Sequence, residues 1–128
     1  MEQSSKPTLL IVDDDQPNLT IFRALYMRKF NILTATSGPE GLEQLKENDD
    51  VRICFSDLKM PRMDGLEFVN LAREDYPNIS YVILSGSDLG VTLENALDEG
   101  VIDGYIHKPF DAKDLDDMID KFLPPSEE

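Results

Sequence analysis

Short apolar runs of strand length alternate along this chain with segments whose apolar residues recur at helical spacing. The strand candidates are residues 8–12, 31–35, 51–56, 80–84 and 103–107. Helical spacing is found near residues 17–28, 38–47, 65–74, 87–100 and 115–122. The first run, TLLIV, is apolar almost throughout, which is typical of a parallel strand buried on both faces. The alternation predicts an α/β fold with a mostly parallel sheet in a three-layer sandwich.

Capping side chains precede three of the predicted helices. Ser37, Asp64 and Asp111 each stand three residues before an acid, the spacing of a capping box. Asp15 is interpreted as the N-cap of the first helix and not as a metal ligand. The first helix is expected to bury one face, made of Leu19, Phe22, Leu25 and Tyr26.

The segment at 87–100 is the weakest of the predicted helices. Gly90 interrupts its early part, and a glycine inside a helix costs about 1 kcal/mol relative to alanine. We therefore expect this helix to be the least stable and the most mobile. Short polar tails at 1–6 and 124–128 are expected to flank a single domain over residues 1–128, whose core spans about 8–122.

Composition excludes several classes of protein. The chain has 26 acidic and 12 basic side chains, a net charge of −14 that repels nucleic acids and anionic membranes. It has no apolar run of about 18 residues and no signal-peptide pattern, so we expect a cytoplasmic protein. Cys54, the single cysteine, excludes an internal disulfide and is expected to be a core residue. His107 is interpreted as a strand-edge side chain, and one histidine with one cysteine leaves no zinc site.

Polar side chains follow four of the predicted strands, at the end where ligands collect in such sheets. The first strand ends in Asp13-Asp14-Asp15, the third in Asp57, the fourth in Ser85-Gly86-Ser87 and the fifth in Lys108-Pro109. The first, third and fourth strands are expected to be neighbours. The sequence therefore predicts a pocket with three carboxylates, a hydroxyl and an ammonium group.

Three converging carboxylates indicate a bound cation. Asp13, Asp14 and Asp57 would repel one another without one, and oxygen ligands suit Mg²⁺. With the metal bound, Asp57 can act as a nucleophile toward phosphorus. Mg²⁺, Lys108 and the Ser85 hydroxyl would each take one phosphoryl oxygen.

Each of these residues also has an ordinary interpretation. Asp14 alone could be a helix cap or a ligand, Ser85 an ordinary loop serine and Lys108 a surface lysine, while Asp64 is most simply a helix cap. The coincidence of four strand ends carries the hypothesis, and no single residue does.

Four motifs, LLIVDDD, SDLKMPRMDGLEFV, VILSGS and GYIHKPF followed by DAKDL, occur in this order between about Thr8 and Phe122. Together they resemble the receiver domain of bacterial response regulators, such as the chemotaxis regulator. The resemblance implies a flavodoxin-like, doubly wound (βα)5 fold with strand order 2-1-3-4-5. It implies Asp57 as the phosphoacceptor and Mg²⁺ as the cofactor. The implied metal ligands are Asp13, Asp14, Asp57 and the backbone carbonyl of Lys59.

The resemblance also implies a switching mechanism. Ser85 would be the switch hydroxyl, Lys108 would contact the phosphoryl group, and Tyr105 would be the switch aromatic that rotates inward. The Lys108–Pro109 peptide bond would be cis. The surface of the fourth helix, fifth strand and fifth helix would then change shape.

By the same resemblance, the donor would be a sensor histidine kinase or a phosphotransfer protein. The output would be a downstream protein, an attached effector domain or phosphorylation-dependent dimerisation. The chain would be a signalling phosphoacceptor, catalysing only its own phosphorylation and dephosphorylation. Lys59 flanks the pocket, and its long basic side chain could shade the phosphoryl group from the water that removes it. Its effect on the phosphoryl lifetime is therefore open.

Three other functions use the same fold or the same chemistry. A flavin mononucleotide carrier would need a phosphate loop where this chain has DDDQPN. A phosphatase of the haloacid dehalogenase type fails at Pro17 of its strand-one pattern. A degenerate, binding-only receiver is disfavoured because the acids, Ser85 and Lys108 are all present. The sequence names neither the kinase nor the target, and it does not say whether the chain is part of a larger regulator.

Overall fold

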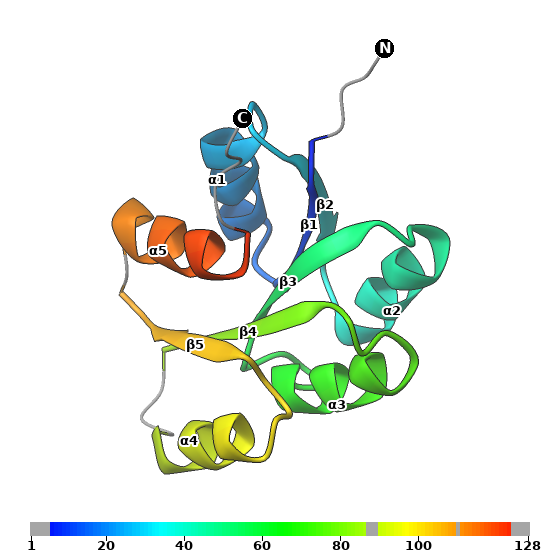
Figure 1. Ribbon diagram of the computed structural model, residues 1–128, viewed down its shortest axis with the longest axis vertical. Coiled ribbons are helices and arrows are strands. Elements are labelled where there is room, and N and C mark those ends of the chain that lie inside the picture. The colour runs from blue at the N-terminus through cyan, green and yellow to red at the C-terminus, as the bar shows by residue number, and fades with distance from the viewer. Residues whose placement is uncertain (1–5, 87–89, 110, 124–128) are drawn as a thin grey trace.

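The computed structural model describes residues 6–86, 90–109 and 111–123, so Ser87 and most of both predicted tails lie outside the described residues. Within these ranges, five strands alternate with five helices (Figure 1). The strands are β1 (Thr8–Val12), β2 (Asn31–Ala35), β3 (Val51–Asp57), β4 (Ser80–Ser85) and β5 (Gly104–His107). The helices are α1 (Gln16–Tyr26), α2 (Gly38–Glu47), α3 (Gly65–Asp75), α4 (Gly90–Asp98) and α5 (Ala112–Phe122).

All strand pairs in the sheet are parallel, and their order is β2-β1-β3-β4-β5. This order confirms the predicted flavodoxin-like, doubly wound fold. From β1 the chain first winds outward to β2 and then returns to β3 on the other side, so the order reverses between β1 and β3. Ligand sites in such sheets lie beside the carboxyl ends of the strands at this reversal.

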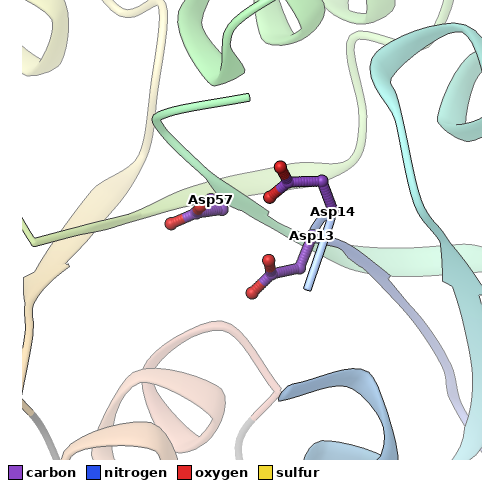
Figure 2. Close-up of side chains that lie close together, drawn as sticks. All are labelled: Asp13, Asp14 and Asp57. Atoms are coloured by element: carbon purple, nitrogen blue, oxygen red, sulfur yellow. The ribbon is translucent and has the colours of Figure 1, made fainter. Parts of the chain in front are cut away.

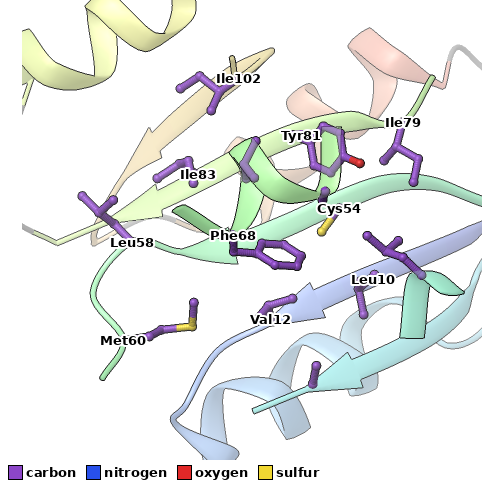
Figure 3. Close-up of a cluster of buried hydrophobic side chains, with 14 of the residues drawn as sticks. Leu10, Val12, Cys54, Leu58, Met60, Phe68, Ile79, Tyr81, Ile83 and Ile102 are labelled. Atoms are coloured by element: carbon purple, nitrogen blue, oxygen red, sulfur yellow. The ribbon is translucent and has the colours of Figure 1, made fainter. Parts of the chain in front are cut away.

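Two apolar layers explain why β1 reads as a continuous apolar run. Successive side chains of a strand point to opposite faces. Leu10 and Val12 pack with Phe68 and Tyr81 in a cluster beneath α2, α3 and α4 (Figure 3). Leu9 and Ile11 pack on the other face, beneath α1 and α5, with side chains that include Phe22, Phe55, Leu115 and Ile119. Helices thus cover both faces of the sheet and bury the apolar side chains on each face.

The predicted core residues are mostly buried. Cys54 is fully buried, as predicted, and burial raises the pKa of its thiol, which leaves it a packing residue. The prediction for α1 was wrong at one position, because Leu25 is 49% exposed while Leu19, Phe22 and Tyr26 are buried. Each residue advances a helix by about 100°, so Leu25 lies at the border of that face.

The helix starts follow the predicted caps, although one of the four caps makes no side-chain hydrogen bond. Asp64 and Asp111 form capping boxes with the acids three residues later, and the Ser37 hydroxyl accepts from the Glu40 amide. Asp15 occupies the N-cap position of α1 without a side-chain cap bond. The structure describes α4 from Gly90 onward, and residues 87–89 lie outside the described residues, so the interruption of this helix by Gly90 stays a prediction. The mobility of α4 stays a prediction.

A hydrogen-bonded ion pair joins α3 to the residues that precede β5. The Arg73 guanidinium lies 2.6 Å from Asp103 Oδ2 and donates to the Val101 carbonyl at 2.9 Å. Asp103 Oδ2 also accepts from the Tyr81 amide at 2.8 Å, and the guanidinium lies over the Tyr81 ring. These bonds fix the start of β5 against β4.

Candidate functional site

Three carboxylates meet at the carboxyl edge of the sheet. Asp13 and Asp14 follow β1, and Asp57 is the last residue of β3, one residue beyond the predicted end. β1 and β3 are adjacent and in register at Val12 and Ser56, so the residues that follow lie side by side. One carboxylate oxygen from each acid lies within 4.8 Å of the other two (Figure 2). Asp13 and Asp57 are buried and Asp14 is exposed, so the cluster is open to solvent on one side.

Asp13 is held by two hydrogen bonds within the first turn after β1. Its Oδ1 accepts from the Asp15 amide at 2.9 Å, and its Oδ2 accepts from the Asn18 side-chain amide at 3.1 Å. Sequence reasoning missed Asn18, although its place five residues after Asp13 in the first turn of α1 is compatible with this contact. The bonds fix the carboxylate without adding a positive charge.

Lys108 reaches the cluster from the loop after β5. Its Nζ lies 2.8 Å from Asp57 Oδ1, and its backbone amide donates to the Ser85 carbonyl at 2.7 Å. The cis peptide bond between Lys108 and Pro109, predicted from the family resemblance, is confirmed. The hydrogen bond to Ser85, at the end of β4, fixes the backbone from which the Lys108 ammonium group extends.

The electrostatics of Asp57 are unbalanced. Burial raises the pKa of its carboxyl above the ordinary value, and the charges of Asp13 and Asp14 raise it further. The hydrogen bond and charge of Lys108 lower the pKa without cancelling the effect of burial. A single ammonium group therefore does not compensate three clustered acids, and the site favours additional positive charge.

The loop between β3 and α3 closes against the same edge. The Gly65 amide donates to the Leu58 carbonyl at 2.8 Å. A Cβ at position 65 would overlap the Asp57 carbonyl oxygen, so this close approach requires glycine. Lys59 has an exposed side chain, and its carbonyl stays a predicted metal ligand. Asp64 caps α3, as expected.

The two predicted switch residues lie on adjacent strands. Ser85 ends β4 and is fully buried, while Tyr105 lies within β5, half-buried, opposite Ile83. The Tyr105 hydroxyl donates to Glu94 Oε2 of α4 at 2.6 Å, a contact that sequence reasoning missed. His107 is exposed at the end of β5, and its ring meets the Tyr105 ring edge-on at 5.7 Å between centroids. The switch roles stay predictions.

A mainly apolar groove of about 310 Å³ opens between α1 and α5 beside the acids. Asp13 and Lys108 lie in its wall together with Ile21 and Leu25, which are 59% and 49% exposed. Pro109 and Ala112 line it on the side of α5. The groove thus joins the polar site to an exposed apolar surface.

Comparisons with known proteins agree with this geometry. A family model described as the response regulator receiver domain matches residues 9–120. The sensor kinase CckA of Brucella abortus is 32% identical over 93% of this chain, and the transcriptional regulatory protein ZraR of Escherichia coli is 33% identical over 90%. The matches cover 13% and 26% of those two proteins, so this chain corresponds to a small part of each.

Solved structures show the same similarity. A response regulator receiver domain protein from Clostridium thermocellum superposes with a TM-score of 0.85 at 28% identity. That match covers 91% of this chain and 94% of the other. Among the described residues, no helix combines the length and the hydrophobicity needed to cross a membrane.

Proposed function

This chain belongs to the response regulator receiver domain family of two-component systems, and on that premise we propose that it is a single receiver domain phosphorylated on Asp57. The donor is the phosphohistidine of a sensor histidine kinase or of a phosphotransfer protein. One observation carries the proposal. The buried Asp57 carboxylate clusters with Asp13 and Asp14 and is also bonded to Lys108.

The donor set fits a magnesium ion. The clustered oxygens of Asp13, Asp14 and Asp57 match the preference of Mg²⁺ for carboxylate ligands and water. The backbone carbonyl of Lys59 is proposed as a further ligand. Bound Mg²⁺ would supply the positive charge that the cluster lacks and would attract phosphoryl oxygens.

The residues of the chain then support the transfer. An oxygen of the Asp57 carboxylate attacks phosphorus, the bond from phosphorus to the imidazole nitrogen breaks, and the imidazole leaves with the electron pair. The Lys108 ammonium, now 2.8 Å from Asp57, contacts a phosphoryl oxygen. The Ser85 hydroxyl contacts another. Because Asp57 must be ionised to attack, the charges of Lys108 and the metal favour the reactive form.

The groove between α1 and α5 supports a protein donor. Asp13 and Lys108 line its inner end, and the exposed Ile21 and Leu25 extend it over the surface. A donor that buries these apolar side chains brings its phosphohistidine toward Asp57. Association of this kind is favoured by the apolar area removed from water.

Phosphorylation is proposed to change the α4–β5–α5 surface. The phosphoryl group adds charge and acceptor oxygens beside Ser85, which moves toward them. Tyr105 then rotates inward, and the surface around it changes shape. The changed surface controls a downstream protein, an attached effector or a second copy of the chain. An attached effector is consistent with the small share of CckA and ZraR that the chain matches.

Intact-mass spectrometry tests the proposal directly. The protein is incubated with acetyl phosphate and Mg²⁺, beside an Asp57→Asn variant and a sample containing EDTA. We expect a gain of one phosphoryl group that both controls lack. A gain that persists in Asp57→Asn would place the acceptor elsewhere. A wild type that neither gains a phosphoryl group nor responds to beryllium fluoride, a stable phosphoryl mimic, would be a binding-only receiver.

A further inference from the structure

A hydrogen bond links Tyr105 of β5 to Glu94 of α4. The Tyr105 hydroxyl donates to Glu94 Oε2 at 2.6 Å, across 11 residues of sequence. The bond raises the pKa of the Tyr105 hydroxyl, because a nearby carboxylate opposes formation of the phenolate. The phenol is a protonated donor at neutral pH even without this shift, since its ordinary pKa is about 10.

This bond holds the aromatic ring toward the surface. The Tyr105 ring is half-buried, and it lines a surface groove beside β5 and α5 with Met118 and Lys121. Its hydroxyl is bonded to an exposed carboxylate. Ser85, by contrast, is fully buried at the end of the adjacent strand, opposite His107. The hydroxyl of Tyr105 is thus directed to a partner on α4 and not to the interior beside Ser85.

An inward rotation of Tyr105 must break this bond. Turning the ring toward Ser85 carries the hydroxyl away from α4, where the Glu94 carboxylate stands. The contact therefore stabilises one arrangement of the ring and is lost in the other. A contact made in only one of two states shifts the equilibrium between them.

We propose that Glu94 is a positioning residue that acts through Tyr105 and holds the domain in its unphosphorylated arrangement. This inference rests on the proposed function, since it concerns the same switch. The bond opposes the rearrangement that follows phosphorylation. Removing the carboxylate lowers that opposition and lets a weaker signal switch the domain.

Titration with beryllium fluoride, a stable phosphoryl mimic, tests this proposal in the presence of Mg²⁺. Backbone amide resonances near Asp57 report binding, and ring ¹³C resonances of the tyrosines report the position of Tyr105, assigned with Tyr105→Phe. We expect Glu94→Ala to lower the beryllium fluoride concentration at the midpoint by about threefold to tenfold, the range that one such hydrogen bond supplies. Glu94→Gln, whose amide oxygen still accepts a bond, should lie closer to the wild type.

Two controls separate the bond from a general effect of charge. Asp98→Ala removes a carboxylate from the same helix one turn later, and its midpoint should equal that of the wild type. In a Tyr105→Phe background, Glu94→Ala should have no further effect, because the hydroxyl is already missing. An equal shift in Asp98→Ala, or a full shift in the Tyr105→Phe background, would overturn the proposal.

Failure of the proposed function gives a different result. If the wild type does not respond to beryllium fluoride, the switch itself is absent and the role of Glu94 falls with it. If the wild type responds while Glu94→Ala has the same midpoint, only the role of Glu94 is wrong.

Discussion

The Lys108 ammonium group contacts the Asp57 carboxylate at 2.8 Å although their strands, β5 and β3, are separated by β4. The lysine side chain crosses the end of β4, and its backbone is bonded to Ser85 on that strand. Asp57 nevertheless keeps a raised pKa, because burial and two neighbouring acids outweigh this contact. The fold therefore disfavours the ionised form of this carboxyl, and a bound cation would favour it.

Replacing Asp57 should stabilise the metal-free protein. The pKa of Asp57 is higher in the folded state than in the unfolded chain. Below about pH 4 the carboxyl is mainly protonated in both states, so it takes little from the free energy of unfolding. As the pH rises through the raised pKa, ionisation of Asp57 destabilises the fold increasingly. We expect Asp57→Asn to raise the melting temperature by about 3 to 5 °C at pH 7, the shift produced by about 1 kcal/mol.

Thermal unfolding in EDTA between pH 4 and pH 7 measures this effect. The difference between Asp57→Asn and the wild type should grow with pH. Asp49→Asn, which changes an exposed acid, serves as the control and should show no such growth. A difference that shrinks with rising pH would mean that the carboxylate is stabilised in the fold.

Magnesium should stabilise the wild type through Asp13. At a free Mg²⁺ concentration ten times the dissociation constant, binding adds about 1.4 kcal/mol to the free energy of unfolding. Asp13→Asn should lose most of this gain, since Asp13 is buried and already oriented by Asn18. Asp15→Asn is the matched control, because Asp15 is exposed and its side chain makes no cap bond. Equal magnesium effects in both variants would exclude Asp13 as a ligand.

Lys108 should be needed for phosphorylation and less so for folding. Lys108→Met keeps the length of the side chain but removes the charge that faces Asp57. We expect the rate of phosphorylation by acetyl phosphate to fall by about a hundredfold, as when a preorganised donor is removed from other active sites. Lys113→Met removes an exposed lysine paired with Asp117 and should leave the rate unchanged. A normal rate in Lys108→Met would remove the lysine from the mechanism.

Asp103 should contribute to stability without affecting phosphorylation. Asp103→Ala leaves the Tyr81 amide and the Arg73 guanidinium without their shared acceptor. We expect the free energy of unfolding in urea to fall by about 2 kcal/mol. Asp98→Ala, an exposed acid on α4, should change it by less than about 0.5 kcal/mol. A loss of phosphorylation in folded Asp103→Ala would show that the contact between Arg73 and Asp103 also affects the site around Asp57.

Sequence reasoning located the polar groups at the strand ends because their positions depend on local patterns. Buried parallel strands read as apolar runs, so the residue after each run marks an end of the sheet. Asp13, Asp57 and Lys108 could be grouped in this way before any contact was known. The family resemblance supplied the strand order, which the structure confirms.

The contacts that were missed depend on tertiary packing. The bond from Tyr105 to Glu94 and the ion pair between Arg73 and Asp103 join segments 11 and 30 residues apart. No periodicity marks such pairs. Leu25 fits an apolar helical pattern, yet it faces the open groove and not the core.

Borohydride trapping after reaction with acetyl phosphate and Mg²⁺ shows directly whether Asp57 is the phosphoacceptor. Borohydride reduces an aspartyl phosphate to homoserine, which survives digestion. Trypsin cuts after Arg52 and Lys59, and the peptide 53–59 carries Asp57 as its only acidic side chain. We expect homoserine at position 57 in that peptide. Homoserine at position 13 or 14 instead, or none in a sample that gains phosphoryl mass, would contradict it.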